Sequence, residues 1–363
     1  MPLYFLQKKE IININFKEIV ICFIVDEKSG FMKDIYSLNY KSVLNLMETQ
    51  VAIKFVKDTF QKELVKKLKL LRVTAPLFVL SNSGLNDNLS GNETPVSFEV
   101  DDKEVEIIHS LAKWKRMALG KYGFKPETGL YTDMNAIRKD EHLDCIHSIY
   151  VDQWDWERVI LKENRNYSYL KKIVRLIYKA IISLENKVSK KYPSLKIELP
   201  KDIYFISTKE LEEKYPSLSF KEREDAICRE KKAVFLYQIG YPLKDGKPHD
   251  SRAADYDDWN LNGDILLYNE MYDMAFEISS MGIRVDENSL VDQLKCKNEL
   301  YKLENDYCQN IINKKLPYTI GGGIGQSRLC MYFLKKAHIG EVQVSYWDKE
   351  EIEKLKEVGI ELL

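Results

Sequence analysis

The chain has 363 residues, of which 45% are apolar and 31% are charged, enough to bury a substantial core. Its 55 basic and 56 acidic residues are interspersed and leave a formal net charge of −1, so no global field attracts nucleic acid. The longest apolar run covers the seven residues from Ile19 to Val25, far short of the ~20 that cross a bilayer, so we expect neither a nucleic-acid partner nor a membrane span.

The first 46 residues differ from the rest of the chain. They are rich in Ile, Asn, Phe and Lys and show no strong helical period, although residues 19–25 could form a short strand. From Thr49 to Leu70, apolar residues recur at helical spacing with charged residues between them, which predicts an amphipathic helix. We therefore expect an N-terminal extension of unknown role over residues 1–46 and a folded core over residues 47–363.

Short strands, a polar loop and a helix are predicted next. Residues 71–80 are strand-like but contain Pro76, which favours a sheet edge or a bend. Residues 81–92 are dense in Ser, Asn, Asp and Gly and indicate a loop. Ser110 is expected to cap a helix over residues 111–119. Further strands are predicted at 97–100, 104–108, 144–153 with its continuation to 159, 204–207 and 233–239.

Helices and paired strands alternate in the second half of the chain. Residues 264–268 and 274–280 are typical of a strand pair. Because strands often follow strands directly, the order favours an α+β fold with a mainly antiparallel sheet flanked by helices over a doubly wound parallel sheet. Helices are predicted at 168–192, 209–215, 221–230, 288–310 and 327–335.

The familiar nucleotide-binding signatures are missing. The sequence has no GxxxxGK[ST] loop. The run Gly321–Gly325 lies near the C-terminus without the βαβ context of a dinucleotide fold, and we expect a hairpin-like turn there. Arg328 follows in the first turn of a predicted helix, where its guanidinium could lie on a purine ring.

The six cysteines include no CxxC pair and no Cys/His spacing typical of a zinc site. A chain of this length does not need disulfides, so we interpret the cysteines as reduced thiols. This interpretation predicts a cytoplasmic protein.

Eight blocks of sequence, in order from about Met47 to the C-terminus, resemble the asparagine synthetase A family of ammonia-dependent aspartate–ammonia ligases. The blocks are Asp87-Asn-Leu-Ser-Gly91, His109-Ser-Leu-Ala-Lys-Trp-Lys-Arg116, Gly129-Leu-Tyr-Thr132, Tyr150-Val-Asp-Gln-Trp-Asp-Trp-Glu-Arg158, Asp255-Tyr-Asp-Asp-Trp259, Leu261-Asn-Gly-Asp-Ile265, Phe276-Glu-Ile-Ser-Ser-Met-Gly-Ile-Arg-Val285 and Thr319-Ile-Gly-Gly-Gly-Ile-Gly-Gln-Ser-Arg-Leu329.

The resemblance implies a fold and a reaction. The fold is that of a class II aminoacyl-tRNA synthetase catalytic domain without its tRNA-reading parts, with a seven- or eight-stranded antiparallel sheet, in a homodimer. In the reaction, aspartate and ATP form β-aspartyl-AMP and pyrophosphate, and ammonia then displaces AMP. Residues 47–363 would form this catalytic domain.

The resemblance also implies roles in handling ATP. Attack on the α-phosphate gathers negative charge, which arginine and a metal can stabilise. Arg138 lies where the family's α-phosphate arginine is expected, and Arg328 where an arginine stacks on adenine. Mg²⁺ prefers oxygen ligands, and the candidates are Asp264 and Glu277, with Ser280 serving ATP beside them.

For the amino-acid substrate, the resemblance implies contacts from both ends of aspartate. Ser110, Lys115, Gln153 and Asp155 are the expected contacts, with Arg284 as a further candidate. Lys115 could instead neutralise the β-carboxylate during activation.

Two further aspartates complete the implied site. Asp87 lies in the polar loop and is the candidate for accepting a proton from ammonium before attack. Asp257 would hold the substrate amine or a neighbouring arginine such as Arg252.

Three alternatives remain at this point. An aspartyl- or asparaginyl-tRNA synthetase would share the adenylate chemistry, but only 46 residues precede the core, fewer than an anticodon-binding barrel takes. A glutamine-dependent synthetase would need a cysteine at its N-terminus, whereas Pro2 follows Met1 and the first cysteine is Cys22. An inactive paralogue would be expected to have lost a key arginine or acid, and none is missing.

Overall fold

The computed structural model describes residues 35–37, 39–87, 89 and 93–363 of the chain. The short strand expected at residues 19–25 lies outside these residues. Within the described part, no helix has the length and apolar character that a membrane crossing needs.

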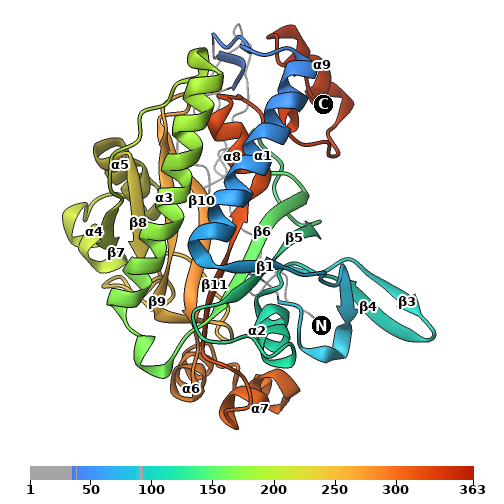
Figure 1. Ribbon diagram of the computed structural model, residues 1–363, viewed down its shortest axis with the longest axis vertical. Helices are drawn as coiled ribbons and strands as arrows, with labels where there is room; N and C mark the ends of the chain where they lie inside the picture. The colour runs from blue at the N-terminus through green and yellow to red at the C-terminus, as the bar shows by residue number, and fades with distance from the viewer. Residues whose placement is uncertain (1–34, 38, 88, 90–92) are drawn as a thin grey trace, which may run out of the picture. The chain divides into compact units, whose positions relative to one another are not determined.

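Eight strands form the central sheet of the described chain (Figure 1). In sheet order they are β1 (Leu70–Arg72), β5 (Gly129–Ile137), β6 (Tyr150–Val159), β11 (Thr319–Gly325), β10 (Met274–Arg284), β9 (Asp257–Asn269), β8 (Ala233–Tyr237) and β7 (Tyr204–Ser207). Only the outermost pairs, β1 with β5 and β7 with β8, are parallel; the pairs between them are antiparallel. The expected α+β fold with a mainly antiparallel sheet is confirmed.

A second, smaller sheet projects from the lower right of Figure 1. It consists of β2 (Phe78–Leu80), β4 (Lys103–Ile107) and β3 (Ser97–Val100), in that antiparallel order. The single interrupted strand expected at residues 71–80 is therefore two strands in two sheets. Pro76 lies between them, where the chain leaves one hydrogen-bond ladder for the other.

Helices cover both faces of the central sheet. The two longest, α1 and α3, lie side by side across one face (Figure 1), where Phe60 of α1 packs on Trp154 of β6 with ring centroids 4.9 Å apart. On the other face, Ile227 of α5 packs with Leu266 of β9. The helices are α1 (Leu46–Leu68), α2 (Ala112–Lys121), α3 (Tyr167–Lys191), α4 (Thr208–Lys214), α5 (Phe220–Lys231), α6 (Glu287–Cys296), α7 (Asp306–Ile312), α8 (Gln326–Phe333) and α9 (Lys349–Glu357).

Two expectations at helix ends need correction. Leu111, not Ser110, occupies the N-cap position of α2, although Ser110 Oγ still accepts a hydrogen bond from Ala112 N at 3.1 Å. The single helix expected over residues 288–310 is broken after α6. Asn298 adopts a left-handed φ of 57°, which ends the helical path before α7 starts with Asn305 as its cap.

Two strands also differ from the sequence-based expectation. Residues 144–149 do not extend β6, because Asp144 Oδ1 accepts hydrogen bonds from the amides of Ile146 and His147, both at 2.8 Å, and holds a turn. The strand β5 was not predicted, although its second half alternates: Thr132, Met134 and Ala136 are buried, and Asp133 and Asn135 lie on the more exposed face.

Part of the segment expected to be an extension packs on the C-terminal region. Tyr40 donates to Glu341 at 2.9 Å, and Lys336 donates to Ser42 Oγ at 2.8 Å. These contacts place the chain just before α1 against the segment that follows α8.

Candidate active site

A cavity of about 360 Å³ lies on the face of the central sheet that α1 and α3 leave open. The alternation of side chains along β6 sets this direction. Trp154 and Trp156 point into the core beneath the two long helices, whereas Gln153 and Asp155 line the cavity. The middle of the sheet therefore forms the cavity floor.

Ten of the twelve residues singled out in the sequence line this cavity, although they are spread over more than 200 positions. They are Ser110, Lys115, Arg138, Gln153, Asp155, Asp257, Glu277, Ser280, Arg284 and Arg328. Asp87 and Asp264 lie next to it but not in its lining.

The glycine run does not form the hairpin-like turn expected from the sequence; it is the strand β11, held between β6 and β10. A Cβ on Gly321 would overlap Glu157 Oε2 and lie 2.7 Å from Arg284 Nη2. A Cβ on Gly323 would overlap Oε1 of Gln153. Glycine is needed because side chains from the two neighbouring strands meet across the backbone of β11.

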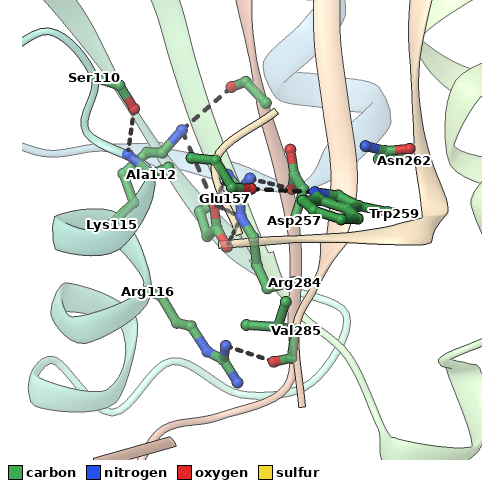
Figure 2. Close-up of polar contacts among 12 residues, drawn as sticks. Ser110, Ala112, Lys115, Arg116, Glu157, Asp257, Trp259, Asn262, Arg284 and Val285 are labelled. Atoms are coloured by element: carbon green, nitrogen blue, oxygen red, sulfur yellow. Dashed lines mark hydrogen bonds and ion pairs between the residues drawn. The ribbon is translucent and has the colours of Figure 1, made fainter. Parts of the chain in front are cut away.

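Below the cavity lies a buried group of five charged side chains, which we call the ion cluster: Lys115, Asp155, Glu157, Asp257 and Arg284. Figure 2 labels Lys115, Glu157, Asp257 and Arg284. Arg284 donates to both oxygens of Glu157, at 2.6 Å from Nη2 and 2.9 Å from Nε, and from Nη1 to Asp257 at 2.5 Å. Lys115 pairs with Asp155 and lies 3.9 Å from Glu157. Each of the five is at most 5% exposed.

Three carboxylates against two cations leave the ion cluster with one net negative charge when all are ionised. Burial raises the pKa of Asp155 and of Asp257, and burial lowers the pKa of Lys115. Burial opposes ionisation of Glu157 as well, but Arg284, Lys115 and Thr319 together outweigh it and lower the pKa of that carboxyl. A positively charged ligand group above the cluster would relieve the imbalance.

Not every buried cation near the cluster belongs to it. Arg116, on the same helix as Lys115, turns the other way in Figure 2 and donates to the backbone oxygens of Val285 at 2.8 Å and Pro317 at 2.9 Å. Arg116 therefore links α2 to the backbone just after β10 and just before β11, and its guanidinium does not face the cavity.

Two arginines line the cavity away from the cluster. Arg328, in the first turn of α8, donates to Glu277 O at 3.1 Å, and its guanidinium lies 5.8 Å from the ring centre of Phe276. Arg138 follows β5, and its buried Nε has no hydrogen-bond partner among the described residues. A donor left unused beside a cavity is suited to an anionic ligand.

A β-bulge gives β10 its polar face. Glu277 pairs with Leu266, Ser279 with Ile265 and Ser280 with Asp264, so Ile278 is the extra residue. Residues three apart on a regular strand point to opposite faces. The bulge brings Glu277 and Ser280 to the same face, beside Arg328.

Asp264 lies just behind the cavity wall. It pairs with Arg252, which also bonds Asp250 at 2.6 Å and lines the cavity. Burial raises the pKa of Asp264 to about 8; Arg252 opposes the shift and the charge of Glu277 adds to it. Its Oδ1 atom has no hydrogen-bond partner among the described residues.

Asp87 lies in the loop after β2 and lines a separate, smaller cavity. Its Oδ1 atom accepts from the amide of Leu89 at 2.8 Å, and Leu89 lines the main cavity. Asp87 therefore belongs to the boundary between the two cavities and not to the floor of the main one.

Sequence reasoning gave no role to Glu157 and Tyr256. Glu157 continues the i, i+2 alternation of Gln153 and Asp155, and that periodicity could have identified it. Tyr256 lines the main cavity with its ring 5.7 Å from the guanidinium of Arg284, but a tyrosine between two aspartates gives no comparable signal.

Comparison with solved structures defines the class of fold. Asparaginyl-tRNA synthetase from Pyrococcus horikoshii, solved with asparaginyl-adenylate, aligns over 81% of this chain and 68% of its own, with a TM-score of 0.60 and 16% identity. An aspartyl-tRNA synthetase from Entamoeba histolytica aligns over 84% and 59%, with a TM-score of 0.56. The fold is the class II aminoacyl-tRNA synthetase catalytic fold, as the resemblance implied.

Sequence comparison is more specific. The profile of the family described as aspartate–ammonia ligase matches residues 47–359. The aspartate–ammonia ligase of Clostridium tetani is 60% identical over 327 residues, covering 89% of this chain and 96% of that protein, and that of Ruminiclostridium cellulolyticum is 56% identical at similar coverage. The chain belongs to the aspartate–ammonia ligase family, and the predicted resemblance is confirmed.

Proposed function

We propose that the protein joins ammonia to the β-carboxylate of aspartate at the expense of ATP, through β-aspartyl-AMP. The observation that carries the proposal is the division of the main cavity into two ends. One end lies over the net-negative ion cluster, and the other holds Arg138 and Arg328, two arginines that face it. Such a cavity suits an amino acid beside a polyphosphate.

Aspartate would bind over the ion cluster. Its α-ammonium group supplies the positive charge that the cluster lacks, with Asp155, Asp257 and Gln153 as acceptors. Its carboxylates need donors, and Ser110 and Lys115 lie in the same lining. Arg284 acts as a positioning residue in this scheme, because its side-chain hydrogen bonds go to the acidic side chains of Glu157 and Asp257.

ATP would occupy the arginine end. Arg138 stabilises the charge that develops on the α-phosphate as the β-carboxylate attacks, and Arg328 stacks on the adenine ring. The bond from the α-phosphorus to the bridging oxygen breaks, and pyrophosphate leaves. Glu277 and Ser280 face this end from β10.

Mg²⁺ is the expected cofactor. Among the described residues no group of three or more His, Cys, Asp or Glu is placed to hold a metal, but Mg²⁺ commonly uses only one or two protein carboxylates with phosphate oxygens. The unpartnered Oδ1 of buried Asp264, next to Glu277, fits that need. The ion would neutralise phosphate charge, and Asp264 and Glu277 would hold it.

The second half-reaction consumes ammonium. Ammonium loses one proton before attack, and Asp87 is the proposed acceptor. The nitrogen then bonds to the β-carbonyl carbon, the bond to the AMP oxygen breaks, and a second proton goes to solvent. The products are asparagine and AMP.

We further propose a cytoplasmic homodimer that binds no nucleic acid. Met47 and Val51, one turn apart on α1, are 74% and 52% exposed, and Leu71 on the outer strand β1 is 61% exposed. Apolar side chains next to a sheet edge are suited to a second copy. Sedimentation equilibrium should give twice the chain mass of 42.6 kDa, and a monomer at micromolar concentration would contradict the dimer.

The experiment that tests the function follows asparagine and AMP in parallel, with aspartate, Mg-ATP and either ammonium or glutamine. Equal amounts of the two products with ammonium alone are expected. Aspartate-dependent pyrophosphate exchange into ATP without any asparagine would mean that another acceptor is used, and the tRNA synthetase alternative would then be tested with labelled amino acid and tRNA.

A further inference from the structure

Two polar atoms at the arginine end of the main cavity have no partner within the described part of the chain. They are the carbonyl Oε1 of Gln343 and the hydroxyl Oγ of Ser327, and both are buried. The two residues line the cavity and are only 6% and 3% exposed. A buried polar atom without a partner costs free energy unless a ligand satisfies it. We therefore expect a polar edge of the ligand to lie at this place.

One carboxylate fixes how both residues lie. Asp152, on β6, accepts through Oδ1 from the backbone amide of Ser327 at 3.0 Å and from Gln343 Nε2 at 3.3 Å. Its other oxygen accepts from Lys57 Nζ of α1 at 2.9 Å. Gly325, the N-cap of α8, has no side chain to bond the first turn, so Asp152 supplies that contact from the neighbouring strand.

This arrangement determines which end of the Gln343 amide remains for a ligand. The two ends differ, since the amide nitrogen donates hydrogen bonds and the amide oxygen accepts them. A carboxylate that is paired with a lysine only accepts, so the nitrogen of Gln343 must face Asp152 and the oxygen must face away from it. The ligand group that meets Gln343 Oε1 has to be a hydrogen-bond donor.

The surroundings of Gln343 suit a flat aromatic ring. Ile146 and Ile339 line the same cavity, and Arg328 directly follows Ser327 in the first turn of α8. Apolar side chains and a guanidinium are groups on which an aromatic base packs. Of the two common purines, adenine carries an amino group at the position where guanine carries a carbonyl oxygen. An acceptor at this place therefore favours adenine.

We propose that Gln343 determines the base specificity of the protein: its Oε1 atom accepts a hydrogen bond from the exocyclic amino group of adenine, and Asp152 is the positioning residue that fixes the amide. The inference rests on the proposed function, which places the base of ATP beside Arg328. A guanine base would set its carbonyl oxygen against Oε1, acceptor against acceptor. Ser327 Oγ can donate to a ring nitrogen of the base.

The test compares ATP with the triphosphate of purine riboside, which lacks only the exocyclic amino group. Calorimetry in the presence of Mg²⁺ gives the dissociation constant of each nucleotide. The unmodified protein should bind ATP about tenfold more tightly, because only ATP satisfies the buried acceptor. Gln343→Met keeps the length of the side chain without the amide. In this variant the preference for ATP should disappear, and the affinity for purine riboside triphosphate should change little.

The matched control is Val344→Ala, because Val344 is the next residue, is 66% exposed and does not line the cavity. It should keep the full preference for ATP. A preference that persists in Gln343→Met, or equal binding of the two nucleotides by the unmodified protein, would overturn the inference and leave the proposed function standing, since binding is measured without the reaction. If the unmodified protein bound neither nucleotide, the use of ATP itself would be rejected.

The positioning role of Asp152 has its own test. In Asp152→Asn, the single amide oxygen cannot face both Lys57 and Gln343, and the cationic Lys57 takes it. The nitrogen then faces Gln343, whose own amide must turn over, so the preference for ATP should be lost. Adding Lys57→Met releases the oxygen for Ser327 and Gln343, and the preference should return. An unchanged preference in the single variant, or no return in the double variant, would overturn this role.

Discussion

In the cavity floor, single buried residues contribute to stability through the ion pairs that they form. Glu157 is fully buried and accepts a two-pronged contact from Arg284. Replacing Glu157 with Gln should lower the free energy of unfolding by about 3 kcal/mol, because it leaves a buried guanidinium without its counter-charge. Urea denaturation followed by circular dichroism measures this change, and the KM for aspartate should rise in the same variant.

The matched control is an exposed acid. Asp58→Asn breaks the Lys54–Asp58 pair on the surface of α1, where both side chains are at least half exposed. We expect it to change the free energy of unfolding by less than about 0.5 kcal/mol. If Glu157→Gln costs no more than this control, the ion cluster is not the electrostatic unit described above.

Much of the site could be anticipated residue by residue from the motifs, since ten of twelve positions line one cavity. The side-chain contacts that those residues make with one another could not be predicted. Arg284 was expected to contact substrate, but its donors are taken up by Glu157 and Asp257. That pairing depends on which strands are neighbours, and the sequence alone gives no register between β6, β11 and β10.

Among the elements, β11 is the one whose composition determines the site. Gly321→Ala should lower kcat/KM by about 100-fold, because the new Cβ must push Glu157 and Arg284 apart and shift the cavity floor. Steady-state kinetics measure the loss. Gly120→Ala on the exposed side of α2 is the control and should keep full activity, since its Cβ meets only Pro317, at 3.3 Å. Full activity in both variants would contradict the role assigned to the glycines.

The long helices were predictable because their apolar period is unambiguous; α1 and α3 start and end within three residues of the expected positions. The glycine strand was not predictable. Glycine favours turns when it is judged locally, and only the crossing side chains from β6 and β10 explain why Gly321–Gly325 is extended. The bulge at Ile278 is equally invisible in a run of ordinary strand residues.

At the scale of the whole molecule, His338 should make stability depend on pH. It is 1% exposed, burial lowers its pKa to about 4, and its Nδ1 atom accepts a hydrogen bond from Gly340 N at 3.0 Å. Since the folded-state pKa lies below the usual 6.5, the unfolded chain binds the proton first. Stability is therefore lost as pH falls from about 6.5 to 4, by up to about 3 kcal/mol.

The variant His338→Asn isolates this contribution because Asn keeps an acceptor for Gly340 but does not titrate in that range. Unfolding free energies of both proteins are measured by urea denaturation from pH 7 to pH 4, so that carboxylates common to both cancel in the difference. The difference should shrink toward low pH. Parallel curves would show that His338 has the same pKa in the folded and unfolded chains, and a difference that grows toward low pH would show that its folded-state pKa is raised.

The central position of β11 also has a consequence for how the protein is made. Its two neighbours, β6 and β10, are synthesised earlier and cannot pair with each other in the native order. Until residues 319–325 have left the ribosome, the nascent sheet has two open inner edges and its acids and arginine cannot meet. Such edges invite contacts with other chains. Protection of the growing chain by chaperones would matter most in that interval, and the site comes into being in one of the last steps of folding.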